Sequence, residues 1–560
     1  MPSLIMGIND IPYNKYPRGG LIMDETYDVV VLGSGAAGMT AALRAAQGGL
    51  KVLVVEKTAR LGGTSAMSGA GTWVPANHIA AKAGVQDSSE EALTYLHAVS
   101  PAGWESDEAP LWRAFAYAAP QMLKFVEAHT PLRFKLVDEP DPFPESPGGK
   151  SVGRMVTPKV LSRRILGRFS RSLRDSTLVT LFDYDEMVRH DPYHHPIRTG
   201  LRLLPQLARR WLTRSGGQGT ALMAGLIKGC LDLRCTFLLR TRACRLVSDK
   251  SGRVTAVEVE HDGSKRVIAA RRGVVLATGG FEWDTMMRKE FFPGPVDRIG
   301  SPRTNEGDGQ KMASEAGALL ARMDQANIYP CLPTRYEGRS HGLPVTYQAE
   351  PHSIIVNRDG RRFLSEYDFN IGEILDQRDP ETGEPVHLPA WLIADIRFLG
   401  RSLPFRWYAS YDKRWTVRAD TLEDLAGKIG LSPQALADTV KRFNTFCDEG
   451  VDRDFGRGTG TWDTYKSHGS NNTLGKIEKG PYLAFRLNRS ILGTKGGART
   501  NASGQVLRTD GSVLEGLYAA GLAMANPIGT RAVGAGTTIG PNMTWGFICA
   551  GTILGQGKKG

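Results

Sequence analysis

The pattern of apolar and polar positions predicts a strand, a helix and a second strand near the start of the chain. Between Tyr27 and Lys57, the apolar run VVVL leads into a glycine turn, then into an alanine-rich segment, and then into the second run VLVV. Short apolar runs bounded by glycine are typical of strands buried on both faces, and the segment between them has helical spacing. A parallel strand–helix–strand unit is therefore expected here.

The pattern changes further along the chain. Helical spacing dominates from Ser88 to about Thr130, a Pro- and Gly-rich loop covers 139–149, and alternating apolar positions predict strands between Thr236 and Ala277. The pattern of apolar and polar positions is then mixed as far as Pro481, after which glycine-rich loops and short strands return. This order predicts a nucleotide-binding domain made by both chain ends, with another domain inserted between them.

Length and composition fit a protein of several domains. The 560 residues exceed what one core supports, and 41% hydrophobic with 23% charged residues is ordinary for a globular protein. No stretch approaches the roughly 18 consecutive apolar residues that a membrane span needs. The first twenty residues or so lack a charged start followed by an apolar core, so we interpret them as a surface arm, not a secretory signal, and expect a cytoplasmic protein.

The six cysteines show no pattern of a functional site. None forms a CxxC pair or a haem-attachment site, and no His/Cys cluster has zinc spacing. Buried free thiols are expected, and no metal site, iron–sulfur cluster or covalent haem.

The net charge of +12 is concentrated in two arginine-rich stretches, Leu161–Arg174 and Ile197–Arg214. Apolar residues recur in both at helical spacing, as on a basic amphipathic helix. A solvated helix face is one interpretation. The other is peripheral attachment to the inner face of an anionic membrane, where apolar substrates and quinones reside. No nucleic-acid-binding motif accompanies the charge, so nucleic acid is not an expected partner.

The first strand–helix–strand unit carries a dinucleotide-binding fingerprint. Gly33 permits a tight turn, Gly35 lets the backbone approach a pyrophosphate, and Gly38 lets the helix pack closely on the strand. A diphosphate would lie at the helix N-terminus, where free N–H groups and the helix dipole favour negative charge. Glu56 ends the second strand, where a carboxylate binds ribose hydroxyls. Strand, helix and acid are in register, so dinucleotide binding is predicted.

Three further glycine-rich segments favour FAD over NAD. They are Arg60–Pro75, the Gly279–Gly280 pair after a buried strand, and a long block that ends near Gly546. A bare NAD domain does not need a second Gly/Ser/Thr loop. Several such loops, each beside a short apolar strand, indicate a long cofactor threaded through the domain.

These segments resemble the fumarate reductase/succinate dehydrogenase flavoprotein superfamily, and within it the 3-ketosteroid Δ1-dehydrogenase branch. The likeness covers about Tyr27 to Thr552, including GGTSAMSGAGTWVP, GVVLATGGFEWD, SIIVNRDGRRFLSE and GAGTTIGPNMTWG. It implies a two-domain α/β flavoprotein with a Rossmann-like FAD domain from residues 1–281 and 482–560. An inserted α+β catalytic domain would occupy 282–481, with the flavin at the interface.

The resemblance also implies which residues contact FAD. They are Gly33, Gly35, Ala36, Ala37, Gly38, Glu56, Lys57, Gly62, Gly63, Thr64, Ser65, Ser68, Gly69, Ala243, Ala277, Thr278, Gly279, Gly521, Gly536, Thr538 and Ile539. Succinate dehydrogenases tether the flavin to a histidine near the second glycine loop. Residues 62–71 contain no histidine, so non-covalent FAD is expected.

The chain departs from the ketosteroid enzymes where those enzymes carry their phenols. One phenol and a backbone N–H hold the substrate carbonyl, because an α C–H is a poor acid until the carbonyl is polarised. A second phenol removes the α-proton, assisted by a third. Aligned on the motifs, the three positions are Phe143, Asn370 and Ala532, which we place in the substrate pocket. Gly536 is retained, and its N–H is the expected carbonyl donor.

Several residues are candidates to replace the phenols. Tyr193 lies among three histidines and is the predicted base or proton relay, although a surface turn between two prolines explains it equally well. Thr537 offers a hydroxyl near the carbonyl. Arg531 offers a carboxylate contact or a proton, or else a flavin or surface contact. Trp112 is expected either to narrow the pocket or to pack in the core.

The expected activity is FAD-dependent α,β-desaturation of a cyclic ketone on a CH–CH group. The ketone would be a small monocyclic one, as in a cyclohexanone dehydrogenase-type enzyme, or a 3-ketosteroid. Hydride would pass to the flavin, and electrons then to a quinone or another acceptor. One alternative is a fumarate reductase-type reductase of an enone or enoate. Another is a flavoprotein without turnover.

Overall fold

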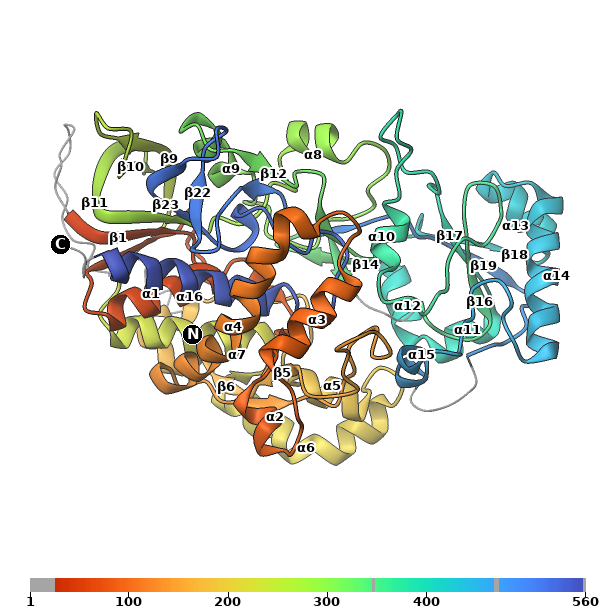
Figure 1. Ribbon diagram of the computed structural model, residues 1–560. Coiled ribbons are helices and arrows are strands. Elements are labelled where there is room, and N and C mark those ends of the chain that lie inside the picture. The colour runs from red at the N-terminus through yellow and green to blue at the C-terminus, as the bar shows by residue number, and fades with distance from the viewer. Residues whose placement is uncertain (1–25, 345–347, 468–472, 557–560) are drawn as a thin grey trace, which may run out of the picture.

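The computed structural model describes residues 26–344, 348–467 and 473–556. Two halves lie side by side in Figure 1: the left half holds the first and last parts of the described chain, and the right half holds its middle. The predicted N-terminal arm lies outside the described residues. No helix in the described ranges combines the length and apolarity that a membrane crossing requires.

The left half is built on a sheet whose central strands are parallel. The order is β22–β23–β11–β1–β2–β8, and β9 and β10 extend it from β11. The bounds are β1 (Thr26–Leu32), β2 (Val52–Val55), β8 (Thr236–Leu238), β9 (Thr241–Ser248), β10 (Val254–His261), β11 (Ser264–Leu276), β22 (Gln505–Leu507) and β23 (Val513–Ala519). Strand β23 pairs in parallel with β11, so the C-terminal segment completes a sheet begun by the N-terminal one. The predicted α/β fold with a nucleotide-binding domain from both chain ends is confirmed.

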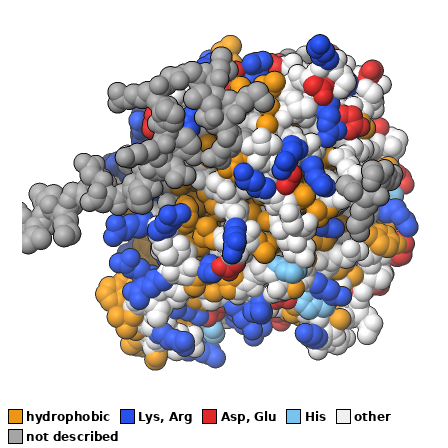
Figure 2. Space-filling view, turned by 90° about the vertical axis from the view of Figure 1, so that its left-hand side faces the viewer, with side chains coloured by type: hydrophobic (Ala, Val, Ile, Leu, Met, Phe, Trp, Pro, Cys, Tyr) orange, Lys and Arg blue, Asp and Glu red, His pale blue; other side chains and the backbone are white. Residues whose placement is uncertain are grey.

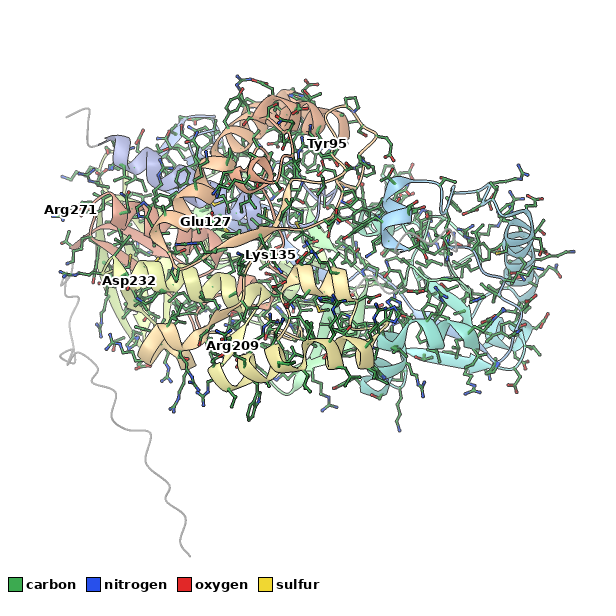
Figure 3. All side chains as sticks on the ribbon, turned by 90° about the horizontal axis from the view of Figure 1, so that it is seen from below. Tyr95, Glu127, Lys135, Arg209, Asp232 and Arg271 are labelled. Carbon is green, nitrogen blue, oxygen red and sulfur yellow. The ribbon has the colours of Figure 1, made fainter. Side chains whose placement is uncertain are left out.

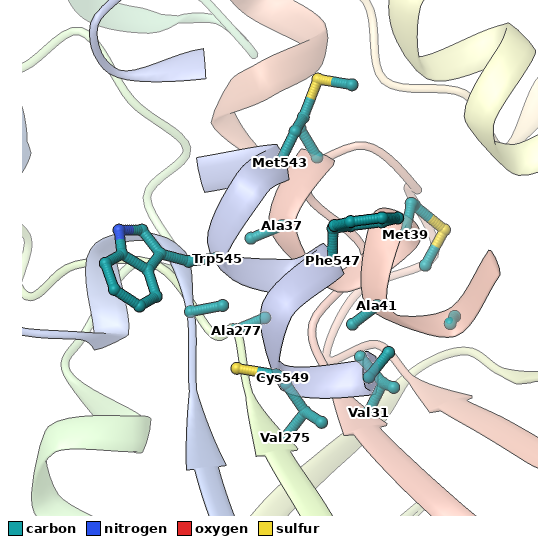
Figure 4. Packing of buried hydrophobic residues seen from close by; sticks show 14 of the residues in the cluster. Val31, Ala37, Met39, Ala41, Val275, Ala277, Met543, Trp545, Phe547 and Cys549 are labelled. Carbon is teal, nitrogen blue, oxygen red and sulfur yellow. The ribbon is translucent and has the colours of Figure 1, made fainter. Parts of the chain in front are cut away.

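Two helices pack on the sheet and on each other, and a third packs on the first. They are α1 (Ala36–Gln47), α16 (Ile539–Gln556) and α7 (Gln218–Asp232). Helices α1 and α16 approach closely because Gly546 has no side chain, and a Cβ there would lie 2.2 Å from the Ala37 carbonyl oxygen. Figure 4 shows Met543, Phe547 and Cys549 of α16 packed among alanines of α1 and valines of the sheet. Burying such side chains stabilises the fold by about 1.5–3 kcal/mol each.

The helical region predicted from Ser88 to Thr130 is confirmed as α3 (Ser89–Val99) and α4 (Glu105–His129). The other elements before residue 282 are short. They are η1 (Thr64–Met67), β3 (Thr72–Trp73), α2 (His78–Lys82), β4 (Phe134–Leu136), β5 (Met155–Pro158), β6 (Leu161–Ser162), η2 (Arg163–Arg171), α5 (Tyr184–His190), α6 (Pro196–Thr213) and β7 (Ser215–Gly216).

The two basic stretches differ in structure. The second is the helix α6, as predicted. The first is the 3₁₀ segment η2, interrupted at Gly167, where φ is +54°. Glycine adopts this left-handed conformation at little cost, so it breaks the helical path that the apolar spacing predicts.

The right half is organised around an antiparallel sheet in the order β16–β17–β19–β18. Helices α13 and α14 cover one face, and α11 and α12 pack with a second apolar cluster. The bounds are β16 (Ser353–Val356), α10 (Ile371–Leu375), β17 (Trp391–Asp395), α11 (Ile396–Arg401), α12 (Leu403–Tyr408), η3 (Ala409–Tyr411), β18 (Thr416–Ala419), α13 (Leu422–Ile429), α14 (Pro433–Glu449), α15 (Thr461–Lys466) and β19 (Tyr482–Arg486).

Residues 285–344 and 491–498 connect the halves. They form α8 (Thr285–Phe291), α9 (Asp308–Glu315), β12 (Leu320–Ala321), β13 (Ala326–Ile328), β14 (Cys331–Tyr336), β15 (Arg339–Pro344), β20 (Ile491–Thr494) and β21 (Gly497–Ala498), and η4 (Gly521–Ala523) follows β23. Helix α9 packs against β9 of the left half. The domain limits at 281/282 and 481/482 stay a prediction.

All six cysteines are free thiols in the structure. Four are buried, whereas Cys244 and Cys447 are half-buried. The expectation of buried thiols therefore holds for four of the six.

Candidate active site

A cavity of about 330 Å³ opens at the carboxyl ends of β1, β2 and β11, where open α/β sheets bind their ligands. Nineteen of the twenty-one residues predicted to contact FAD line it. They are Gly33, Gly35, Ala36, Ala37, Glu56, Lys57, Gly63, Thr64, Ser65, Ser68, Gly69, Ala243, Ala277, Thr278, Gly279, Gly521, Gly536, Thr538 and Ile539. The structure thus brings four distant glycine-rich segments to one place.

The other two predicted glycines lie beside this flavin cavity and not in its wall. A Cβ on Gly38 would lie 2.2 Å from the Gly33 carbonyl oxygen, so this glycine permits close helix packing. Gly62 has φ of +108°, and its N–H donates to the Ser34 hydroxyl at 3.0 Å. Both glycines shape the loops that form the cavity.

Glu56 is fixed at the end of β2 by the turns around it. Its carboxylate accepts a hydrogen bond from the Ser34 hydroxyl at 2.6 Å and from the Thr58 N–H at 3.0 Å. The neighbouring Lys57 Nζ lies 3.0 Å from an Asp308 oxygen, which ties β2 to α9. A carboxylate held in this way is suited to accept the hydroxyls of an adenosine ribose.

The lining fits FAD. The Thr278 hydroxyl is buried in the cavity wall and has no hydrogen-bond partner among the described residues, so a polar ligand group would satisfy it. Gly33 has φ of +106°, and a Cβ there would lie 2.2 Å from the Ala277 carbonyl oxygen, so only glycine allows this approach of two backbones. No histidine or cysteine is among the described lining residues. The cavity therefore offers neither of those side chains for a covalent flavin link.

A second cavity of about 310 Å³ adjoins the first. The residues that line both are Tyr184, Asn327, Pro344, Leu492, Ala535, Gly536 and Thr538. Its remaining walls come from both halves of the molecule, with Phe369, Asn370 and Trp462 on the right-hand side. A ligand here would lie against the flavin cavity, so we call it the substrate cavity.

Three tyrosines line the substrate cavity, from positions that the motifs did not indicate. Tyr184 begins α5, whose start is fixed by a capping box between Asp183 and Glu186. Tyr329 follows β13, and Tyr465 lies in α15. Phenols are thus present in the cavity although the three family positions lack them.

Glu139 joins two of these phenols. It is buried, and one of its carboxylate oxygens accepts hydrogen bonds from the Tyr184 hydroxyl at 2.9 Å and the Tyr465 hydroxyl at 3.1 Å. Burial raises the pKa of Glu139, and the nearby Lys466 ammonium and both phenols oppose that rise. Burial, and then the Glu139 charge, raise the pKa of Tyr184 well above its usual value. Both phenols are therefore protonated at neutral pH, and both donate to Glu139.

Tyr329 is in a different environment from the other two tyrosines. Burial raises its pKa, and the charges of Asp368 and Glu139 add to the effect. Its hydroxyl makes no hydrogen bond to a described residue. It is therefore a neutral phenol with a donor available to a ligand.

Of the three substituted family positions, two face the substrate cavity as a pair. The Asn370 side-chain amide donates to the Ala532 carbonyl at 3.1 Å, and the Ala532 N–H donates to the Asn370 amide oxygen at 2.8 Å. This pair links the right half to the last glycine-rich block. Phe143 lines neither cavity and packs at the edge of the main core.

Gly536 and Thr537 are part of the cavity wall. The Gly536 N–H donates to no acceptor in the described part of the chain. Its φ is +80°, and a Cβ would lie 2.5 Å from the Gly71 carbonyl oxygen. The Thr537 hydroxyl donates to the Gly534 carbonyl at 2.7 Å, so it already has an acceptor.

Three other predicted site residues line neither cavity. Tyr193 is buried beside Tyr408, and burial raises its pKa. The Trp112 indole is buried and donates to the Pro527 carbonyl at 2.8 Å, as expected of a core residue. Arg531 pairs with Glu373 at 2.8 Å. Their positions add no support to the catalytic roles predicted for them.

The comparisons with known proteins agree with this geometry. The sequence profile of an FAD binding domain family matches residues 28–539. A 3-oxosteroid 1-dehydrogenase of Mycobacterium tuberculosis is 37% identical, over 96% of this chain and 99% of its own. A 4-oxocyclohexanecarboxylate 2-dehydrogenase of Sinomonas cyclohexanicum is 34% identical, over 95% and 93%.

A solved structure gives the same result for the fold. The 3-ketosteroid Δ1-dehydrogenase of Sterolibacterium denitrificans, in complex with 1,4-androstadiene-3,17-dione, has a TM-score of 0.84 and 32% identity, covering 95% of this chain and all of its own. A flavocytochrome c3 fumarate reductase, at 22% identity and a TM-score of 0.63, shares the fold. The chain therefore belongs to the FAD-binding flavoprotein family that contains the 3-oxosteroid 1-dehydrogenases, and FAD is its cofactor.

Proposed function

We propose that the protein desaturates a cyclic ketone between its α- and β-carbons. The observation that carries the proposal is the substrate cavity, in which three phenols and the Gly536 N–H face the space next to the flavin cavity. The reaction needs such groups, because the carbonyl must be polarised before an α-proton can leave. The relatives that oxidise 3-oxosteroids and 4-oxocyclohexanecarboxylate support the same reaction type.

The carbonyl oxygen would be held by the Gly536 N–H and the Tyr329 hydroxyl. Both line the substrate cavity, and neither donates elsewhere in the described structure. The raised pKa of Tyr329 keeps its hydroxyl protonated, as a donor must be. Donors fixed before the reaction stabilise the enolate-like charge without reorganising. Gly536 lines both cavities, so a carbonyl on it lies near the flavin.

The α-proton would move to the Tyr184 oxygen while the phenolic proton of Tyr184 moves to Glu139. Tyr184 lines both cavities, and its hydroxyl already donates to the carboxylate. A protonated phenol is a poor base by itself, but a phenol that passes its own proton to a carboxylate accepts another in the same step. The Tyr465 hydroxyl donates a second hydrogen bond to the same Glu139 oxygen. This relay replaces Tyr193, which lines neither cavity.

When bound, FAD supplies the two-electron acceptor for the hydride that leaves the β-carbon. The chain positions the ketone between the Tyr184 and Gly536 sides of the shared wall. Gly69 and Gly71 pack against the Tyr184 ring, and a Cβ on Gly69 would lie 3.2 Å from it. The electrons then pass to a quinone or another acceptor.

We infer that a monocyclic ketone fits the substrate cavity better than a steroid, because five aromatic side chains line a cavity of about 310 Å³. Trp112 and Phe143 do not set this size, since neither lines the cavity. The rings in its wall are those of Phe369, Trp462 and the three tyrosines.

Anaerobic mixing of the holoenzyme with cyclohexanone, 4-oxocyclohexanecarboxylate and a 3-ketosteroid tests the proposal. We expect a cyclic ketone to bleach the oxidised flavin absorbance, with a monocyclic ketone faster than the steroid. No bleaching by any of them would contradict the proposal and favour a flavoprotein without turnover. Reoxidation of the reduced enzyme by fumarate would instead favour a reductase, for which Lys466 is the sole cation among the described lining residues.

A further inference from the structure

The helix α6 has its apolar face on the outside of the molecule. Five large apolar side chains of this helix are between 59% and 79% exposed: Ile197, Leu201, Leu204, Trp211 and Leu212. At 3.6 residues per turn, their spacing places them within an arc of about 100°. The helix runs along the lower edge of the left half in Figure 1. Isolated exposed leucines are ordinary, but a continuous stripe of this kind marks an interaction surface.

The opposite face of α6 is the one that contacts the protein. Thr199 and Leu203 are buried there, and the Arg210 guanidinium pairs with both oxygens of Glu186 at 2.7 Å. The helix is therefore anchored by a polar and ionic face while its apolar stripe points away. This is the reverse of the amphipathic arrangement that folds a helix onto a core.

Exposed arginines surround the stripe. Arg198, Arg202, Arg209 and Arg214 are exposed, and none forms an ion pair with a described acidic residue. The neighbouring segment η2 adds Arg164, Arg168 and Arg171. The Arg164 guanidinium donates to the Leu212 carbonyl at 2.9 Å, which holds η2 against the end of the stripe. Figure 3 shows α6 on the underside with Arg209 on it, and hydrophobic and basic side chains lie together along the lower edge in Figure 2.

We propose that α6 docks the protein onto an anionic lipid bilayer. A helix that lies in the membrane interface needs an apolar face to enter the acyl boundary and arginines beside it to meet lipid phosphates, and α6 with η2 provides both. Charge complementarity favours this occupant over a second copy of the chain. A two-fold contact through this face would bring the same arginines against each other. The docking does not depend on the proposed reaction.

The helix α6 also lines a cavity that shares a wall residue with the substrate cavity. Arg198, Thr199 and Arg202 of α6 line a further cavity of about 560 Å³. Lys466 lines this cavity and the substrate cavity alike. A bilayer on α6 would therefore lie near this cavity and its shared Lys466 wall.

Co-sedimentation of the purified holoenzyme with lipid vesicles tests the docking. The vesicles contain phosphatidylcholine alone or mixed with phosphatidylglycerol. We expect binding to the mixed vesicles, and a several-fold weaker binding in 0.5 M salt because the arginine–phosphate attraction is screened. Leu201→Gln with Leu204→Gln and Trp211→Gln should weaken binding at least tenfold. Arg168→Gln with Arg202→Gln and Arg209→Gln should remove the preference for phosphatidylglycerol.

The matched control changes an equally exposed pair on the opposite side of the molecule. Met286 is 77% exposed on α8, and Met286→Gln with Lys289→Gln should bind vesicles like the unaltered protein. Flavin absorbance shows that each variant is folded. The proposal is overturned if the unaltered protein stays in the supernatant or if the apolar variant binds equally well. It is also overturned if sedimentation velocity shows a dimer that the apolar variant dissociates, since a second copy then covers the face.

Discussion

Replacing Glu139 by glutamine isolates the proposed relay. The substitution keeps the size of the side chain and an oxygen that accepts from Tyr184 and Tyr465, whose hydroxyls lie 2.9 and 3.1 Å away. It removes the charge, and an amide cannot take up the phenolic proton. The geometry of the cavity is therefore retained while the proton acceptor is lost.

The expected loss of kcat follows from the role of Glu139 as the proton acceptor. Positioned acid–base groups contribute about 10²–10⁴-fold to a rate. We expect kcat of Glu139→Gln to fall about a hundredfold, which corresponds to about 2.7 kcal/mol in the barrier. KM should change little, because the carbonyl donors Gly536 and Tyr329 are untouched. Tyr465→Phe removes only one hydrogen bond to the carboxylate, and its kcat should fall by only a few-fold.

The assay is the rate of anaerobic flavin reduction by the ketone, followed over pH. Glu139 accepts a proton only when ionised, so the rate in the unaltered enzyme should rise with pH through the pKa of Glu139, which burial raises. That rise should be absent in Glu139→Gln. A variant that reduces its flavin within threefold of the unaltered rate, with the same pH profile, would refute the relay. Unchanged flavin content in the variant excludes a folding defect.

Three further predictions concern the flavin and the stability of the fold. Gly536→Ala should lower kcat about a hundredfold, because a Cβ there would lie 2.5 Å from the Gly71 carbonyl oxygen and would displace the N–H donor. An unchanged kcat in the variant would exclude Gly536 as the carbonyl donor. Acid precipitation should release the flavin into the supernatant, and yellow colour in the pellet would show a covalent link. Burial opposes ionisation of His194, but hydrogen bonds to Asp191 and Glu350 raise its pKa to about 9. Because the pKa of His194 is raised in the folded state, its protonation contributes fully to stability below about pH 6.5. Urea unfolding should show the free energy of unfolding fall by ~1–2 kcal/mol, after solvent screening, as pH rises through 9. The His194→Gln variant should not show this fall.

The flavin half of the site is predictable because its information is local. Gly33, Gly35 and Glu56 lie in one strand–helix–strand unit, and each of the later loops follows a strand of the same sheet. Parallel strands end at the same edge of a sheet, so loops that follow them meet there. Residues such as Ala243 or Gly521 needed the family resemblance, since nothing in their own neighbourhood marks a ligand.

The substrate half is assembled from segments whose sequences carry no such marks. Glu139, Tyr184, Tyr329 and Tyr465 are far apart in the chain, and Tyr465 reaches the others only when the two halves pack together. In the sequence, the three family positions lack phenols, so another base had to be sought. Tyr193 was predicted because histidines lie next to it in the chain. In the structure, one of those histidines, His194, pairs with Asp191 and Glu350, so its proton belongs to a structural network.

The orientation of α6 is a third case in which spacing was not sufficient. The apolar period correctly predicts an amphipathic helix between Ile197 and Arg214. It does not say which face meets the protein, since that depends on whether the partner surface offers apolar contacts or carboxylates. Here the partner offers Glu186, so the face that carries Arg210 turns inward and the apolar face turns out.

The difference between the two halves of the site has a physical origin. On the flavin side, backbone atoms approach two glycines so closely that no larger residue fits. A Cβ on Gly536 would clash with the Gly71 backbone, and a Cβ on Gly33 would clash with the Ala277 backbone. On the substrate side, the cavity wall is made of side chains, and any segment that reaches it can supply a phenol. The Asn370–Ala532 pair joins the two halves through two hydrogen bonds at positions where the family resemblance implies phenols. A phenol at position 370 would break that pair. In the proposed relay the proton-moving groups therefore come from other segments, and of these Tyr184 lines both cavities.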